Sequence, residues 1–64
     1  MLWSDSFDIA IALQEKYPNV DPLSINFVEL CNMVCTLDGF NGKPDQAGEK
    51  ILEAIQMCWL DEID

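Results

Sequence analysis

The amphipathic stretch EKILEAIQMCWLDEID, residues 49–64, constrains the fold of this chain more than any other feature. It contains neither proline nor glycine, the two residues least favourable in a helix interior. At 3.6 residues per turn its large apolar side chains share one face, whereas Glu49, Glu53 and Asp64 lie on the opposite side. The apolar residues are Ile51, Leu52, Ile55, Cys58, Trp59 and Ile63. Because burying a large apolar side chain contributes about 1.5–3 kcal/mol, we expect this helix to anchor a core completed by upstream residues.

The N-terminal part of the chain predicts a helix that begins near Ser4 or Asp5, either of which can serve as its N-cap. Pro18 ends this helix at Tyr17, because the residue before a proline disfavours helical backbone angles. The face suited to the core consists of Ser6, Ile9, Ala10, Leu13 and Tyr17. A third side consists of Phe7, Ile11 and Gln14. Its apolar groups are either covered by the chain termini or exposed as a patch, and we favour cover by the termini.

A second helix is predicted to begin at Phe27. Asn26 can cap it, and Glu29 lies three residues later, as a capping box requires. Its apolar side chains surround most of the helix, so we expect it to be the most buried of the three. They are Phe27, Leu30, Cys31, Val34 and Leu37, flanked by Val28 and Cys35. Gly39 is placed to end the helix.

Turn residues separate the predicted helices. Asp21-Pro22 indicates a turn that enters a short helical or 3₁₀ segment. Residues 40–44, FNGKP, predict a loop from which Phe40 returns to the core. Asp45 is then expected to cap the last helix. The predicted fold class is therefore all-α, a compact three-helix domain.

The charge composition limits the partners of the chain. Twelve acidic residues face three lysines, which gives a net charge of −9. Such a surface repels nucleic acid and anionic membranes, because both attract cationic proteins. It favours a cationic partner or metal ions, although acidity alone also keeps a small protein soluble. The length of 64 residues allows a single domain, spanning residues 1–64.

Cysteine usage and hydropathy predict a cytoplasmic protein. The three cysteines are odd in number, and their spacing suits helices better than a secreted disulfide framework. No apolar run approaches the roughly 20 residues that span a bilayer. The start of the chain does not read as a signal peptide. We therefore expect a reduced, cytoplasmic protein.

Residues for catalysis are not evident. The sequence has no histidine, no glycine-rich phosphate loop and no cluster of basic residues, so we predict that the chain is not an enzyme and has no catalytic residue. Cys31, Cys35 and Cys58 either act as small buried apolar side chains or serve a redox or sulfur-carrier function.

Carboxylates are the more informative group. They lie on the first predicted helix, in the following turn and at the C-terminus, and they form one electronegative surface if the termini lie close together. These residues are Asp5, Asp8, Glu15, Asp21, Asp61, Glu62 and Asp64. Carboxylate oxygens suit hard cations and ferrous iron, in weak and exchangeable sites. The alternative is a solvated negative face without a ligand.

Several segments together resemble a known family. They are the WSDS start at residues 3–6, the YPxxDP turn at residues 17–22 and the EKILEAI and WLDE blocks within residues 49–62. In combination they are similar to the IscX family, small acidic proteins of bacterial iron–sulfur cluster assembly. The resemblance runs from about Trp3 to Asp64. It implies a compact helical domain that is a variant of the winged-helix fold.

The resemblance also implies a function. IscX-family proteins are adaptors or regulators that bind cysteine desulfurase, at a basic surface also used by frataxin, and bind ferrous iron weakly; the scaffold protein and ferredoxin are further implied partners. Carried onto this chain, partner contacts are assigned to Asp5, Asp8, Glu15, Asp21, Asp61 and Glu62, and the weak iron site to Asp5, Asp8 and Glu15. Family members carry acidic residues where this chain has Asn41-Gly42-Lys43, so no contact is assigned to that loop.

Overall fold

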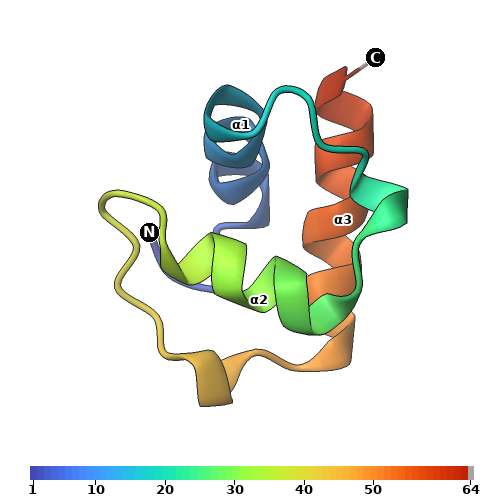
Figure 1. Ribbon diagram of the computed structural model, residues 1–64. Helices are drawn as coiled ribbons and strands as arrows, with labels where there is room; N and C mark the ends of the chain where they lie inside the picture. Colours follow the sequence, from blue (N-terminus) through green and yellow to red (C-terminus); the bar gives the residue numbers. More distant parts are fainter. Residues whose placement is uncertain (64) are drawn as a thin grey trace.

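Helices form the whole regular structure of the described chain (Figure 1). The computed structural model describes residues 1–63, so the place predicted for Asp64 lies outside the described residues. The elements are α1 (Ser6–Lys16), η1 (Pro22–Ser24), α2 (Phe27–Cys35), η2 (Pro44–Gln46) and α3 (Glu49–Ile63), where η denotes a 3₁₀ helix. The predicted all-α, three-helix fold class is confirmed. The winged-helix detail is not confirmed, because residues 1–63 contain no strand that would form a wing.

Local sequence signals account for most helix ends. The α1 helix ends at Lys16, and the Tyr17 N–H, just before the proline, donates the last helical hydrogen bond to Leu13 O at 2.7 Å. Asn26 caps α2 as predicted, since its Oδ1 accepts from the Glu29 N–H at 2.8 Å. Asp21 likewise introduces η1 by accepting from the Leu23 N–H at 3.0 Å. These caps satisfy backbone donors that helices leave free at their N-termini.

Two predicted caps are wrong. Asp45 does not cap α3, because Pro44 begins a separate 3₁₀ turn that contains Asp45, and the chain becomes extended again at Ala47. The α3 helix starts only at Glu49, beyond that extended residue. Gly39 does not end α2, which stops at Cys35 with Thr36 as its C-cap. Gly39 instead lies in the turn that follows, where its φ of 80° suits a residue without a side chain.

The core lies mainly between α1 and α3, which run side by side in the same direction, while α2 runs crosswise against the first half of α3 (Figure 1). Each helix contributes large side chains that are almost completely buried; the core consists of Trp3, Ile9, Ala10, Leu13, Leu30, Val34, Leu37, Leu52, Ile55 and Trp59. The radius of gyration is 10.2 Å, close to the value of about 10.7 Å expected for a compact chain of this length. No helix among residues 1–63 is long and apolar enough to cross a membrane.

Burial differs from the prediction at two side chains. The α2 helix packs on the edge of the α1–α3 pair and leaves Val28 72% exposed. The termini do not cover Phe7, which is 66% exposed. The N-terminus is bound elsewhere: its amino group donates to Gly39 O at 2.6 Å, and Met1 O accepts from the Asn41 N–H at 2.7 Å.

The N-terminus and the loop before η2 form a small aromatic cluster. Trp3 is 6% exposed and meets Phe40 edge to face, with ring centroids 4.8 Å apart. The Trp3 indole N–H donates to Lys43 O at 2.7 Å. A Cβ atom on Gly42 would lie 2.6 Å from Phe40 and 2.7 Å from Trp3. Phe40 therefore returns to the core as predicted, and the chain has no room for a side chain at position 42.

Candidate functional site

The carboxylates predicted to form one surface divide between two regions of the molecule. Asp5 and Asp8 lie at the start of α1. Glu15 lies in the last turn of that helix, and the C-terminal end of α3, which carries Asp61 and Glu62, lies at the same end of the molecule (Figure 1). Because a helix rises 1.5 Å per residue, Asp5 and Glu15 are about 15 Å apart along the axis.

Two of these carboxylates have local structural roles. Asp5 occupies the N-cap position of α1, but its Oδ2 accepts from the Leu2 N–H at 2.9 Å rather than from a helical amide. Asp21 accepts from the Leu23 N–H, as described above. The remaining members of the set are exposed to solvent; they are Asp8, Glu15, Asp61 and Glu62. Their charges are available to a partner, whereas those of Asp5 and Asp21 also hold the local backbone.

The predicted iron ligands do not come together as one site. Within residues 1–63, no group of three or more cysteine, aspartate or glutamate side chains is close enough to hold a metal ion. Asp5 and Asp8 are one helical turn apart, a spacing at which side chains on a helix are neighbours. Glu15 is two turns further along, so the residues offer at most a pair of carboxylates.

An apolar groove between α2 and α3 is a second candidate site. It has a volume of about 260 Å³. Its lining comes from α2, from the residue after η2 and from α3, and consists of Phe27, Val28, Cys31, Asn32, Ala47 and Leu52. The groove lies beside the contact between α2 and η2, where Cys31 Sγ is 3.8 Å from Pro44 O, and Leu52, with 6% exposure, is its buried lining residue.

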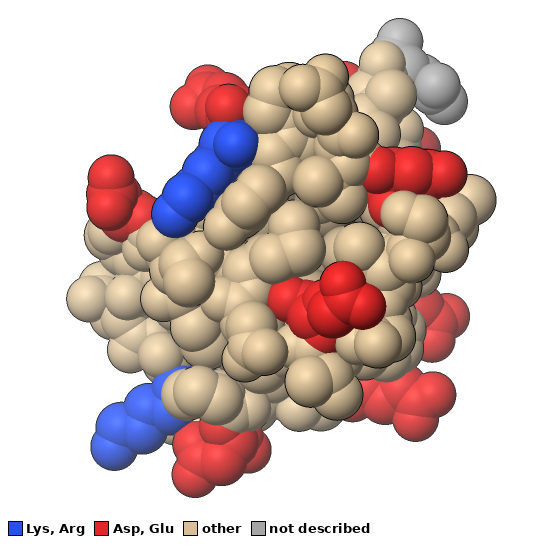
Figure 2. Space-filling view, in the orientation of Figure 1, with Lys and Arg blue, Asp and Glu red and all other residues tan. Residues whose placement is uncertain are grey.

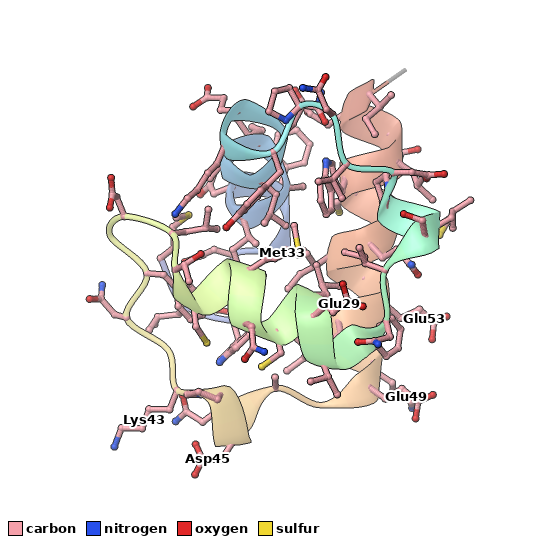
Figure 3. All side chains as sticks on the ribbon, in the orientation of Figure 1. Glu29, Met33, Lys43, Asp45, Glu49 and Glu53 are labelled. Carbon is pink, nitrogen blue, oxygen red and sulfur yellow. The ribbon has the colours of Figure 1, made fainter. Side chains whose placement is uncertain are left out.

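Exposed carboxylates lie on the elements that line this groove, on the face drawn in Figure 3. We call them the groove carboxylates: Glu29, Asp45, Glu49 and Glu53. Lys43 lies near Asp45 on the same face. Figure 2 shows acidic side chains spread over this face, with basic side chains only on its left side. The negative charge is therefore not confined to the region that the sequence predicted.

Sequence reasoning missed this arrangement. The sequence predicts Glu29 only as part of a capping box, and Glu49 and Glu53 only as residues on the solvent-exposed face of a helix. The available signal was the apolar Val28, which lies next to Glu29 on the outer side of an otherwise core-forming helix. An exposed apolar residue beside an acidic one is more informative than either feature alone.

Comparison with known proteins agrees with this picture of a small acidic helical domain. A family model described as iron–sulphur cluster assembly, that of the IscX proteins, matches residues 1–64. The chain belongs to the IscX family. A relative from Pseudomonas aeruginosa, the uncharacterized protein PA3808, is 48% identical over 62 residues, which cover 97% of this chain and 94% of the relative. Membership of the IscX family supports a role in iron–sulfur cluster assembly.

The cysteines of this IscX-family chain are free and half-buried. Burial raises the pKa of the Cys35 thiol, and the neighbouring Cys31 raises it further. Cys31 Sγ lies 3.8 Å from Pro44 O, and Cys58 Sγ lies 4.0 Å from Ser6 Oγ. A raised pKa lowers the fraction of reactive thiolate, so Cys35 is suited to packing rather than to sulfur chemistry.

The structure gives a physical reason for glycine at position 42, in a loop where the family resemblance implies acidic residues. Position 42 lies against Trp3 and Phe40, where even a Cβ atom is too close. An acidic side chain at this position therefore requires a different arrangement of the aromatic cluster. In this chain the loop of residues 41–43 serves as a packing surface for the N-terminus.

Proposed function

We propose that this protein is a non-enzymatic adaptor of iron–sulfur cluster assembly that docks on a basic surface of cysteine desulfurase and modulates it according to ferrous iron. The scaffold protein and ferredoxin are the further partners in this proposal, and the cytoplasm is its location. The observation that carries it is the family match over residues 1–64 in a chain with a net charge of −9. Opposite charges on the two surfaces accelerate encounter and set orientation.

The exposed position of the carboxylates supports docking through charge. Asp8 and Glu15 on α1, and Asp61 and Glu62 on α3, all face solvent. Among the few cations, Lys16 donates to Thr36 O at 2.9 Å and lies over the Tyr17 ring, so it is bound to other groups. The negative field is consequently available for a cationic surface.

The iron site in this proposal uses Asp5 and Asp8, with water completing the coordination. Two carboxylates one helical turn apart are a small ligand set, and hard oxygen donors of this kind bind divalent ions weakly when water supplies most ligands. Ferrous iron would then exchange freely, as an availability signal requires. Glu15 contributes to the surrounding charge rather than to coordination.

The docking proposal is tested by titrating the protein with purified cysteine desulfurase at several salt concentrations. The Debye length falls from about 10 Å at 0.1 M salt to about 3 Å at 1 M, so we expect affinity to fall steeply over this range. The variant D8N/E15Q, which removes two negative charges, should bind more weakly than the unaltered protein at low salt. Affinity that is independent of salt would contradict the proposal.

The iron proposal is tested by an anaerobic NMR titration with ferrous iron. We expect paramagnetic broadening of amide signals around Asp5 and Asp8, and its loss in the D8N variant. The E62Q variant removes one negative charge at the other end of the molecule and is the matched control. Broadening that is the same in D8N and in the unaltered chain would reject this ligand assignment.

The redox or sulfur-carrier alternative is not favoured. The raised pKa of the Cys35 thiol opposes the thiolate chemistry that such a function needs. All three cysteines are also partly covered by neighbouring residues.

A further inference from the structure

We infer that the groove between α2 and α3 receives an apolar side chain from a positively charged segment of the partner protein. This inference rests on the proposed function and adds a second, apolar element to a contact that was otherwise described by charge alone. The four groove carboxylates are not among the carboxylates assigned to partner contact from the sequence.

The size and lining of the groove suit a protein side chain. At about 260 Å³ the groove is smaller than the pockets of about 300–1,000 Å³ that enclose small molecules. Val28 stands at its edge with 72% exposure, and Phe27 and Cys31 are half-buried beside it. Apolar surface that is shallow, open and rimmed by polar groups is typical of protein contacts.

The charge around the groove selects the chemistry of the partner. The four groove carboxylates are exposed, and Lys43 is the cation drawn near them in Figure 3. Lys50, on α3, lines hollows outside the groove, one of them together with Glu53. A segment that carries lysine or arginine on both sides of one apolar residue would therefore match this surface in both charge and polarity.

Other occupants are disfavoured by the same charges. A second copy of this chain has the same net charge of −9 and would bring like charges together. Nucleic acid and anionic lipid are repelled for the reason given above. A cationic, partly apolar protein segment is the occupant that the charges and the apolar lining favour together.

The apolar groove and the groove carboxylates would contribute to binding in different ways. The groove excludes water from the apolar contact, so removal of apolar surface there should mainly accelerate dissociation. The groove carboxylates stay at the solvated rim, so their neutralisation should mainly slow association and reduce its dependence on salt. Kinetic measurements can separate these contributions.

The test compares the variants V28N and L23N in binding to purified cysteine desulfurase. Val28 and Leu23 are both exposed, at 72% and 66%, but only Val28 lines the groove. Valine and asparagine have similar helix propensities, so V28N should fold normally, and circular dichroism checks this. We expect V28N to weaken binding about tenfold, as loss of one valine-sized contact implies, and L23N to change it less than twofold.

A second measurement maps the contact by NMR in the unaltered protein. Signals of residues 27–32 and 47–53 should shift on addition of the desulfurase. If the unaltered chain binds but V28N binds equally well, or if the shifts are confined to α1, the inference is overturned while the proposed function stands. If the unaltered chain does not bind at low salt, the proposed function fails and the inference fails with it.

Discussion

Replacing Gly42 by alanine should destabilise the protein through a steric clash. The added Cβ would lie 2.6 Å from Phe40 Cζ and 2.7 Å from both Cδ1 and Nε1 of Trp3. Ordinary carbon–carbon contacts are about 3.5–4.0 Å long, so the two rings must retreat by about 1 Å. Backbone strain does not contribute to this effect, because Gly42 does not have a positive φ; among residues 1–63 that conformation occurs at Gly39.

Two responses to this clash differ in cost. Overpacking with small shifts costs typically about 1–3 kcal/mol. Expelling Trp3 would expose an aromatic side chain that buries roughly 150–250 Å², which costs about 4–6 kcal/mol at 25 cal/mol per Å². It would also break the indole hydrogen bond to Lys43 O. The smaller cost should prevail, so Trp3 should remain buried and the free energy of unfolding should fall by about 1–3 kcal/mol.

Thermal unfolding followed by circular dichroism measures this effect. For a domain of this size 1 kcal/mol shifts Tm by about 4–8 °C, so Tm should fall by about 5–20 °C in G42A. The matched control is G48A, since a Cβ at Gly48 meets no atom within 4 Å. A G42A variant with the same Tm as G48A and the unaltered protein would refute the packing described for the aromatic cluster.

Two further predictions concern the α2 helix. The N26A variant should lose about 1 kcal/mol of unfolding free energy, because Asn26 Oδ1 accepts from the Glu29 N–H; urea denaturation measures this, and an unchanged midpoint would contradict the cap. Cys35 in the folded protein should be alkylated more slowly than in the urea-unfolded chain near pH 9, because its pKa is raised by burial and by Cys31. Since the unfolded thiol ionises first, this group stabilises the fold below its ordinary pKa and loses that contribution as the pH rises from that value through the raised pKa of the folded protein. Mass spectrometry of the labelled peptides follows the reaction, and identical pH profiles would contradict the raised pKa.

Helix ends and buried helix faces could be predicted from the sequence where local chemistry decides the conformation. Pro18 ends α1 by restricting the backbone of Tyr17 before it, and Asn26 begins α2 by accepting from the Glu29 N–H three positions later. The buried residues of α3 are Leu52, Ile55 and Trp59, all on the predicted face. Where two local signals competed, prediction failed: Asp45 is a good cap, but Pro44 before it began a 3₁₀ turn of its own.

The candidate site was less predictable. Asp5 and Asp8 lie together because they are on one helix, and their spacing follows from the sequence. Glu29 shares a face of the molecule with Glu49 and Glu53 only because α2 packs across the first half of α3 (Figure 3). No periodicity within either helix contains that information, since the relation depends on the loop between them.

By itself the sequence determined the three helices, their apolar faces and a strongly negative charge, because each depends on residue type and on neighbours a few positions away. Tertiary packing decided that Phe7 and Val28 remain exposed and that the N-terminus binds Gly39 and Asn41. It also decided which carboxylates share a face with an apolar groove. Those outcomes depend on how helices distant in sequence share a limited interior, and an edge helix keeps exposed whatever apolar surface its neighbours cannot reach.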